Sequence, residues 1–480
     1  MSQPPVILWF RHDLRVSDHA LLDTTARHSV PYIPFFILDD RAEGDWPSGG
    51  ATRWWLHHSL EKLGEDLAKL GSRLILRHGQ TETELSRLAQ ETGATTVRCH
   101  RRYEPAAKQL ERDVASRLKK DGVEFESFPG HLLFEPDDIR TQQGQPYQVF
   151  TPYWKACQKL ASKIAAPLGK PHSLATPTQW PRSEELGDFQ LLPTIPWDKE
   201  FYDTWTPGEA GAHSRLAALR KVIADYPTDR NRPDHEGSSR LSPHLHFGEI
   251  SPRQVWHAVH KWIDDGIVTA AAASVFLSEL GWREFTQHVL DHFPFTPKSA
   301  LREEFRKFPW KYGKTQERAW QRGLTGYPIV DAGMRQLWRT GWMHNRVRMI
   351  VGSFLTKDLR HNWLDGARWF WDPLVDADLA QNTFNWQWIG GCGADAAPYF
   401  RIFNPTLQGR KFDPDGDYVR RWVPELANCP TKWIHEPWSA PPNELAQAGI
   451  TLGADYPEPI VDHAEARDEA LEALSTVRKK

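Results

Sequence analysis

The pattern of apolar and polar positions divides the chain into two parts that meet near residue 205. In the first part, short runs of β-branched and aromatic residues alternate with stretches whose apolar residues recur every three or four positions, which predicts alternating strands and helices. Strands are expected at 5–10, 32–38, 72–79, 95–100 and 123–128, and two helices at 59–71 and 83–93. This alternation predicts an α/β domain with a parallel sheet, Rossmann-like or flavodoxin-like, although no GxGxxG motif follows the first strand.

The second part lacks strand patterns. Prolines accumulate between about 165 and 198, where the periodicity fades, and this is typical of a connector. Beyond 205 the periodic stretches have the spacing of amphipathic helices, so an all-α domain is expected. The predicted organisation is an α/β domain at 1–135, a connector at 136–204 and a helical domain at 205–480.

Three helical stretches depart from the usual pattern of a core helix. They place carboxylate, guanidinium, carboxamide and indole groups on faces where apolar side chains are expected. The faces are formed by Phe276, Glu279, Trp282 and Arg283, by Asn345, Arg348 and Met349, and by Asp378, Asn382 and Trp386, with Asp376 just before the last. Each face alone is explained by a satisfied core polar group or a surface pair. Together they predict a concave site for a large planar ligand with hydrogen-bonding edges.

Bulk composition narrows the classes of function. No apolar run reaches the roughly 18 residues of a membrane span, and the N-terminus does not resemble a secretory signal, so a soluble cytoplasmic protein is expected. The four cysteines lack metal-ligand spacing, which predicts reduced thiols and no metal site. The net charge of -3 gives no sign of a nucleic-acid partner, but residues 298–322 carry eight basic and three acidic side chains. That segment is either a solvated helix face or a local basic patch.

The stretch GSSRLSPHLHFGEISP at 237–252 suggests a phosphate-binding turn. Ser238, Ser239 and Ser242 lie at the start of an expected helix, whose N-terminal amides attract anions, and Arg240 adds a positive charge. An ordinary helix cap explains the same residues.

Longer motifs carry a resemblance to a known family. The runs LWFRHDLRVSDHALL, TGYPIVDAGMRQLWRTGWMHNRVRMIVGSFLTKDL and RIFNPTLQGRKFDPDGDYVRRWVPEL resemble the photolyase and cryptochrome flavoproteins in order and spacing over nearly the whole chain. The resemblance implies an N-terminal antenna domain, a connector and a helical domain that holds FAD. It also implies UV-damaged DNA as a partner and a base that is flipped out of the duplex.

The resemblance assigns residues to the cofactor. It places Asn382 opposite flavin N5, and it suggests a buried ion pair between Arg348 and Asp376 that closes the pocket. The implied FAD contacts are Tyr226, Ser238, Ser239, Arg240, Leu241, Ser242, Arg283, Asn345, Arg348, Asp376, Asp378 and Asn382.

The resemblance also divides the 23 tryptophans, most of which must be core. Trp386, Trp363 and Trp310 match an electron relay from the surface to the flavin, while Trp282 and Trp388 match indoles that stack on a flipped pyrimidine dimer. Glu279 would bind the dimer's carbonyl edge, and its desolvation would favour a protonated carboxyl that stabilises developing charge. The implied substrate contacts are Glu279, Trp282, Asn345, Arg346, Met349, Trp388 and Arg401, of which Arg346 and Arg401 would reach DNA phosphates.

The antenna chromophore is less well defined by the motifs. Ala106 and Ala107 stand where the class I folate pattern has an Asn-Glu pair, whereas RWWLHHSL at 53–60 resembles class III photolyases and plant cryptochromes. Methenyltetrahydrofolate is therefore expected, with a deazaflavin or an empty site as alternatives.

The expected function is light-driven repair of cyclobutane pyrimidine dimers by a monomeric deoxyribodipyrimidine photo-lyase, a carbon-carbon lyase. The alternative is a cryptochrome-type blue-light photoreceptor. Asn382 and Met349 favour repair, because plant cryptochromes carry Asp at the first position and (6-4) photolyases carry a histidine pair near the second.

Overall fold

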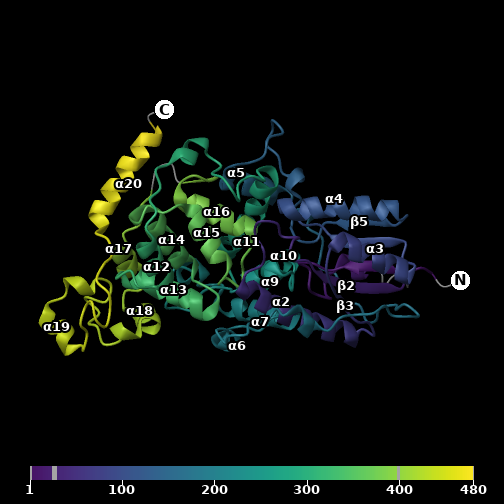
Figure 1. Cartoon of the computed structure of the whole chain (residues 1–480), viewed down its shortest axis with the longest axis horizontal. Coiled ribbons are helices and arrows are strands. Elements are labelled where there is room, and N and C mark those ends of the chain that lie inside the picture. Colours follow the sequence, from purple (N-terminus) through teal and green to yellow (C-terminus); the bar gives the residue numbers. More distant parts are fainter. Residues whose placement is uncertain (1–2, 24–29, 397–400, 479–480) are drawn as a thin grey trace.

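Five parallel strands form the sheet of the N-terminal part in the computed structural model, which describes residues 3–23, 30–396 and 401–478. The strand order is β3-β2-β1-β4-β5, the first five positions of the classic doubly wound order. The strands are β1 (Val6–Trp9), β2 (Tyr32–Leu38), β3 (Ile75–His78), β4 (Thr96–His100) and β5 (Glu124–Phe128). The predicted α/β domain with a parallel sheet is confirmed, and Figure 1 shows it at one end of the molecule.

Both faces of the sheet are covered by helices, which explains why its central strands are continuous apolar runs. In β1, Val6 and Leu8 point into the core shared with α2 (Gly50–Lys69), while Ile7 and Trp9 point into the core shared with α3 (Thr81–Thr92) and α4 (Pro105–Lys120). The alternation of side chains along a strand therefore serves two apolar cores.

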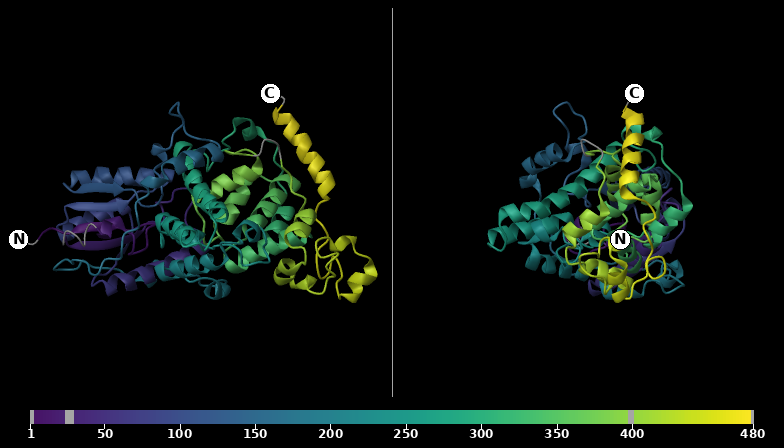
Figure 2. Two further views of the ribbon diagram at one scale, coloured as in Figure 1. Left: turned by 180° about the vertical axis from the view of Figure 1, so that it is seen from behind. Right: turned by 90° about the vertical axis from the view of Figure 1, so that its left-hand side faces the viewer.

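The second part is helical, as predicted, and Figures 1 and 2 show it as a mass of helices beside the sheet. Its C-terminal segment lies at the end of the molecule opposite the sheet. No helix in the described part of the chain combines the length and the apolar character needed to cross a membrane. The helices are α6 (Lys199–Thr204), α7 (Glu209–Val222), α8 (Tyr226–Asp229), α9 (Ser242–His246), α10 (Pro252–Asp264), α11 (Ala270–His292), α12 (Lys314–Arg322), α13 (Pro328–Thr340), α14 (Asn345–Ser353), α15 (Trp363–Trp371), α16 (Leu379–Gly390), α17 (Pro405–Phe412), α18 (Asp417–Trp422), α19 (Pro442–Gln447) and α20 (His463–Arg478).

The connecting region contributes a helix to the helical core near its start. This helix, α5 (Phe150–Lys159), packs against α11 through the buried side chains of Tyr153 and Phe285, whose ring centroids lie 5.0 Å apart. Residues 165–198 have little regular structure, in keeping with their proline content.

The two parts of the molecule meet through a backbone-to-backbone joint. A Cβ atom added at Gly49 would lie 2.5 Å from the backbone of Asp372, so only glycine permits this approach. The joint is reinforced by hydrogen bonds from Gly50 N to Asp372 Oδ1 (2.8 Å) and from Ala51 N to Asp372 O (3.1 Å). The N-terminus of α2 is therefore fixed directly to the end of α15.

Candidate functional site

A cavity of about 660 Å³ opens between the helices at the place where the three unusual faces converge. It is large enough for a cofactor or drug-sized ligand. Of the predicted site residues, Arg346, Trp310 and Trp363 do not line it. The lining includes Tyr226, Ser238, Ser239, Arg240, Leu241, Ser242, Glu279, Trp282, Arg283, Asn345, Arg348, Met349, Asp376, Asp378, Asn382, Trp386, Trp388 and Arg401.

Asp376 and Asp378 lie before helix α16, although sequence periodicity placed Asp378 within it. Helix α16 begins at Leu379, and Asp378 is its N-cap, whose carboxylate accepts a hydrogen bond from Gln381 N (2.9 Å). A carboxylate at this position satisfies one of the free amides of the first turn. Asp376 lies in the preceding turn. The polar face is thus assembled from a cap and a helix, not from one continuous helix.

An ion pair joins α14 to the turn before α16. Arg348 Nη2 lies 3.0 Å from Asp376 Oδ2 and 3.2 Å from Oδ1, and Ser242 Oγ donates to the same carboxylate at 2.7 Å. The Asp376 side chain is buried, whereas Arg348 is about a quarter exposed. The predicted pair is present, and it connects three separate segments at the cavity wall.

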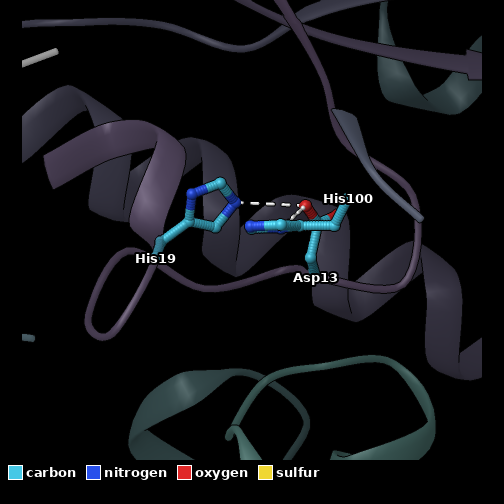
Figure 3. A group of neighbouring side chains, drawn as sticks. All are labelled: Asp13, His19 and His100. Carbon is cyan, nitrogen blue, oxygen red and sulfur yellow. Dashed lines mark hydrogen bonds and ion pairs between the residues drawn. The ribbon is translucent and has the colours of Figure 1, made fainter. Parts of the chain in front are cut away.

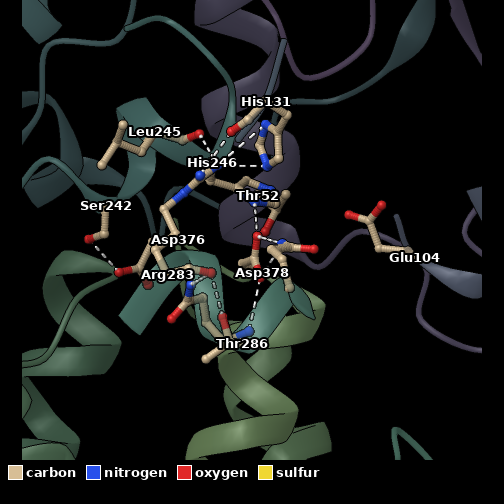
Figure 4. A network of polar contacts seen from close by, with 12 residues as sticks. Thr52, Glu104, His131, Ser242, Leu245, His246, Arg283, Thr286, Asp376 and Asp378 are labelled. Atoms are coloured by element: carbon tan, nitrogen blue, oxygen red, sulfur yellow. Dashed lines mark hydrogen bonds and ion pairs between the residues drawn. The ribbon is translucent and has the colours of Figure 1, made fainter. Parts of the chain in front are cut away.

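Asp378 sits at the centre of the polar network in Figure 4. Gln287 Nε2 donates to its carboxylate at 3.2 and 3.3 Å, and His246 Nδ1 lies 3.5 Å away. Burial raises the pKa of Asp378, but the contacts with His246 and Gln381 N outweigh burial and leave the pKa below its usual value. The carboxylate is therefore ionised and can accept hydrogen bonds from a ligand.

The guanidinium of Arg283 is held by protein groups at the back of the cavity. It donates to His131 O (2.9 Å) and Leu245 O (3.2 Å), and it also contacts the His131 ring (Figure 4). Burial and the charge of Arg283 lower the pKa of His131 well below its usual value, so this imidazole is neutral. Arg283 thereby joins α11 to the loop that follows β5.

Asn382 presents a defined end of its carboxamide to the cavity. Its Nδ2 donates to Ala367 O in α15 (2.9 Å), and its side chain is buried. Because the donor end is occupied, the acceptor oxygen remains for a ligand N–H.

The loop before α9 adopts a strained conformation at the cavity edge. Arg240 has a φ of 51°, which non-glycine residues rarely adopt. Its guanidinium lies 5.0 Å from the centroid of the Trp342 ring and pairs with Glu236, while its buried Nε lacks a hydrogen-bond partner. Strain and an unpartnered donor together are typical of a place that can bind a ligand.

Two residues that the sequence analysis missed contact Trp282 and Glu279 at the cavity wall. Phe150, from α5, stacks on Trp282 with ring centroids 3.7 Å apart and planes inclined by 10°. Arg230, just after α8, forms an ion pair with Glu279. Arg230 follows a helix of one turn, and Phe150 belongs to the regular apolar face of α5, so no break in a pattern marks either residue. Arg346 contacts Asn231 and lies over the Phe412 ring.

The tryptophans near the cavity form an aromatic chain that differs in part from the predicted relay. The ring of Trp386 lies 6.2 Å from that of Trp320, which lies 5.4 Å from Trp369. Trp363 packs in the same core near Gly390, and Trp310 contacts Phe308 at 4.4 Å. Trp386 thus has indole neighbours in a direction that the sequence did not indicate.

The basic segment 298–322 is partly neutralised by its surroundings. Lys298 pairs with Asp45, Arg306 with Glu303 and Lys311 with Glu469. Its local positive charge is therefore smaller than the sequence count suggests.

A second cluster of buried polar side chains lies near the sheet and away from the cavity lining (Figure 3). It consists of Asp13, His19 and His100. Asp13 Oδ2 accepts from His100 Nδ1 (2.8 Å) and His19 Nε2 (3.1 Å), while Oδ1 accepts from Arg11 N (2.7 Å). Burial and the neighbouring His100 lower the pKa of His19 to about 4. A carboxylate saturated by donors accounts for the grouping of these residues.

Comparison with known proteins agrees with this geometry. Residues 276–476 match the family described as the FAD binding domain of DNA photolyase, and residues 6–172 match the family described as DNA photolyase. A deoxyribodipyrimidine photo-lyase of Agrobacterium fabrum is 49% identical over 481 residues, covering 100% of this chain and 99% of that protein.

Other relatives carry the name cryptochrome. Cryptochrome-2 of Arabidopsis thaliana is 39% identical, covering 98% of this chain and 79% of that protein. The crystal structure of a bacterial class III photolyase from Agrobacterium tumefaciens superimposes with a TM-score of 0.96 at 48% identity, covering 100% of this chain and 99% of that one.

Proposed function

The chain belongs to the DNA photolyase family, as its motifs predicted, and we propose that it is a deoxyribodipyrimidine photo-lyase, a carbon-carbon lyase that uses light to repair cyclobutane pyrimidine dimers in UV-damaged DNA. One observation carries the proposal. The indoles of Trp282 and Trp388 line the same cavity as the polar residues that suit a flavin. The cavity thus provides for a cofactor and for an aromatic substrate side by side.

The residues present fit FAD. The cavity offers an unpartnered buried donor at Arg240, serine hydroxyls in the same loop and carboxylates for the N–H and O–H groups of a flavin and a sugar. When bound in reduced form, FAD supplies the light-driven electron donation that splits a dimer. Ser238, Ser239, Arg240, Leu241 and Ser242 would hold its phosphates and ribityl chain. The remaining contacts would come from Tyr226, Arg283, Asn345, Arg348, Asp376, Asp378 and Asn382.

The chain's own residues position the reactants. The oxygen of Asn382 accepts an N–H without titrating, and the pair of Arg348 with Asp376 closes one wall. Trp282, supported by Phe150, offers a fixed ring face to a flipped base. Stacking of this kind is worth roughly 1 to 3 kcal/mol per base, which offsets much of the few kcal/mol that flipping costs.

Two arginines, one at the cavity wall and one outside it, would contact the DNA backbone. Arg346 and Arg401 would bind backbone phosphates, because such contacts position a protein on DNA without reading its sequence. Met349 and Asn345 would contact the dimer. We further propose that the protein acts as a monomer in the cytoplasm.

For the antenna chromophore we propose methenyltetrahydrofolate. A groove of about 520 Å³ is lined by the indoles of Trp46 and Trp371, which suit a pterin ring, and by the cation of Arg368, which suits a folate carboxylate; Lys298 also lines it but is paired with Asp45. A second cavity near Trp9, of about 80 Å³, is far smaller than usual ligand sites. Trp371→Ala should abolish sensitised repair under near-ultraviolet light. Co-purification of a deazaflavin would overturn this assignment.

The test of the main proposal is anaerobic illumination of the reduced holoenzyme with an oligonucleotide that carries one thymine cyclobutane dimer. Dimer loss is followed by chromatography against a dark control. Light-dependent recovery of thymines with multiple turnovers is the expected result. A reduced, flavin-loaded protein that leaves the dimer intact would favour the cryptochrome-type photoreceptor, the family's other activity.

A further inference from the structure

Helix α12 carries positive charge on its outer face and a member of the aromatic chain on its inner face. Lys314, Arg318 and Arg322 recur at every fourth position and are exposed, so they form one stripe along the helix, the α12 stripe. On the buried side, Trp320 is 1% exposed, and its ring lies 6.2 Å from that of Trp386 at the cavity wall. One helix thus connects a charged surface to the cavity through two indoles.

The α12 stripe keeps its charge, unlike other parts of the basic segment. In the described part of the chain, no carboxylate forms an ion pair with its three cations, whereas Arg306 and Lys311 have acidic partners. Between residues 306 and 322 the sequence has a single acidic side chain, Glu317. None of the stripe's cations lines the cavity, so neither a flavin nor a dimer held there accounts for them.

Aromatic side chains precede the stripe at the surface. Tyr312 is 78% exposed, and Trp310, the outer member of the predicted relay, is only partly buried where it packs against the core. This segment is held to the turn before α15 by a hydrogen bond from Lys311 N to Arg360 O (2.7 Å), three residues before Trp363. The predicted relay and the observed aromatic chain therefore both pass within a few residues of the α12 stripe.

A positive surface beside oxidisable indoles suits a negatively charged electron donor. Clustered charge of one sign raises the rate of encounter with a partner of the opposite sign by about 10- to 1,000-fold. Complexes that exchange electrons are weak and bury less than about 1,200 Å², so a stripe along one short helix can form the centre of such an interface.

We propose that the α12 stripe is the docking surface for an acidic electron-carrier protein that returns electrons to the tryptophans. This inference rests on the proposed function, because the indoles lose an electron only when a flavin in the cavity absorbs light. In the docked complex, one electron passes from the reduced carrier to the oxidised indole. The carrier is oxidised by one electron and the indole cation becomes neutral, while no bond forms or breaks and no proton moves.

The first experiment follows the indole radical after a flash given to the oxidised holoenzyme without oxygen. The probe is a reduced plant-type ferredoxin, an acidic one-electron carrier, with a dark control. The second-order rate constant for radical decay should fall about tenfold in the double variant Lys314→Glu, Arg318→Glu. It should also fall for wild type when salt is raised to about 1 M, where the screening length is roughly 3 Å.

Two controls separate docking from other effects. The double variant Lys119→Glu, Lys120→Glu changes the net charge by the same amount at the end of α4 and should keep the wild-type rate constant. Dithiothreitol, an uncharged donor, should reduce the radical equally fast in every variant. The milder double variant Lys314→Gln, Arg318→Gln should lower the ferredoxin rate constant about threefold.

A second measurement detects binding in the dark. NMR signals of isotope-labelled oxidised ferredoxin should shift when wild type or the α4 variant is added, and they should not shift with Lys314→Glu, Arg318→Glu.

Several outcomes would overturn the inference. A wild-type rate constant in Lys314→Glu, Arg318→Glu would show that the carrier docks elsewhere, and an equal fall in the α4 variant would show an effect of net charge alone. A matching fall with dithiothreitol would mean that the substitutions altered the aromatic chain. If ascorbate lost as much rate as ferredoxin, or if undamaged duplex DNA displaced ferredoxin, the stripe would serve a small anion or DNA. Failure of reduced wild type to repair a dimer would instead refute the proposed function, because the flash experiment does not require repair.

Discussion

Two buried polar groups in this protein look alike in composition and differ in what surrounds them. Around Asp13, two imidazoles and a backbone amide donate to one carboxylate (Figure 3). Around Asp376 and Asp378, the donors are also protein groups, but the carboxylates face a cavity of about 660 Å³ (Figure 4). The first group is closed, and the second is open.

The difference shows that a buried charge alone does not identify a site. Both groups obey the rule that buried polar atoms find partners. Only the open group combines unused hydrogen-bonding capacity, at Asn382 Oδ1 and Arg240 Nε, with space for a ligand. The closed group should therefore serve stability, and the open group should serve binding.

The largest effect is expected from Asp13→Ala. It removes the acceptor of two imidazoles and an amide, and each buried donor left unpaired costs about 1 to 3 kcal/mol. The free energy of unfolding should fall by about 4 kcal/mol in denaturant titrations. The folded fraction should retain FAD and repair dimers at the wild-type rate. If Asp13→Ala lost FAD while keeping the wild-type stability, the closed group would serve binding and the contrast with the open group would be wrong.

Asp376→Ala should have the converse effect. It leaves Arg348 and Ser242 without their acceptor at the cavity wall, and breaking a buried pair is costly. We expect FAD affinity to fall about a hundredfold, a smaller change of about 2.7 kcal/mol. Flavin absorbance retained after dialysis measures it, with Asp376→Asn as the milder variant. Unchanged affinity would mean that the open group does not hold the cofactor.

The free energy of unfolding should depend on pH through Lys357 in the helical part. This side chain is 1% exposed and donates to Ile389 O at the end of α16. Burial lowers the pKa of Lys357 to about 7. The unfolded chain then binds more protons than the folded chain between pH 7 and about 10, so stability should rise with pH there by up to about 1.4 kcal/mol per unit.

Lys357→Met should flatten this slope in denaturant titrations at pH 7, 8 and 9. A variant with the wild-type slope would show that Lys357 stays charged in the fold.

The smallest effect concerns Trp386, which lies between the cavity and the other indoles. Trp386→Phe should slow photoreduction of the oxidised flavin about tenfold, a change of about 1.4 kcal/mol in the barrier. Repair by chemically reduced enzyme should be nearly unchanged. Trp320→Phe and Trp363→Phe, compared in the same flash experiment, distinguish the observed aromatic chain from the predicted one. Equal loss of repair and photoreduction in Trp386→Phe would contradict a relay role.

The sequence predicted the classes of structure better than the details of the site. Short apolar runs and period-3.6 patterns report burial directly, so the parallel sheet and the helical part were confirmed. The pattern breaks at Glu279 and Asn382 likewise pointed to the cavity, because a polar residue on an apolar face needs a reason. The order of the strands was beyond such patterns, since it depends on contacts between distant segments.

What the patterns missed has a common physical cause. Arg230 follows a helix of one turn, and Phe150 belongs to the connector, so neither interrupts a regular face. Trp320 sits in a segment that its charges made notable, and its contact with Trp386 is purely tertiary. Asp378 caps α16 instead of lying within it, because periodicity does not specify where a helix begins.

The close backbone contact at Gly49 affects the transfer of excitation between chromophores as well as the packing of the two parts. Because two backbones touch there without intervening side chains, the sheet and the helices have little freedom to hinge or slide at this point. The groove beside Trp371 lies within a residue of this contact. Transfer of excitation between two chromophores depends steeply on their separation and on the angle between their transition dipoles. A chromophore in the groove would therefore keep a constant distance and angle to a flavin in the cavity. Any side chain at residue 49 would change this geometry and so the efficiency of excitation transfer.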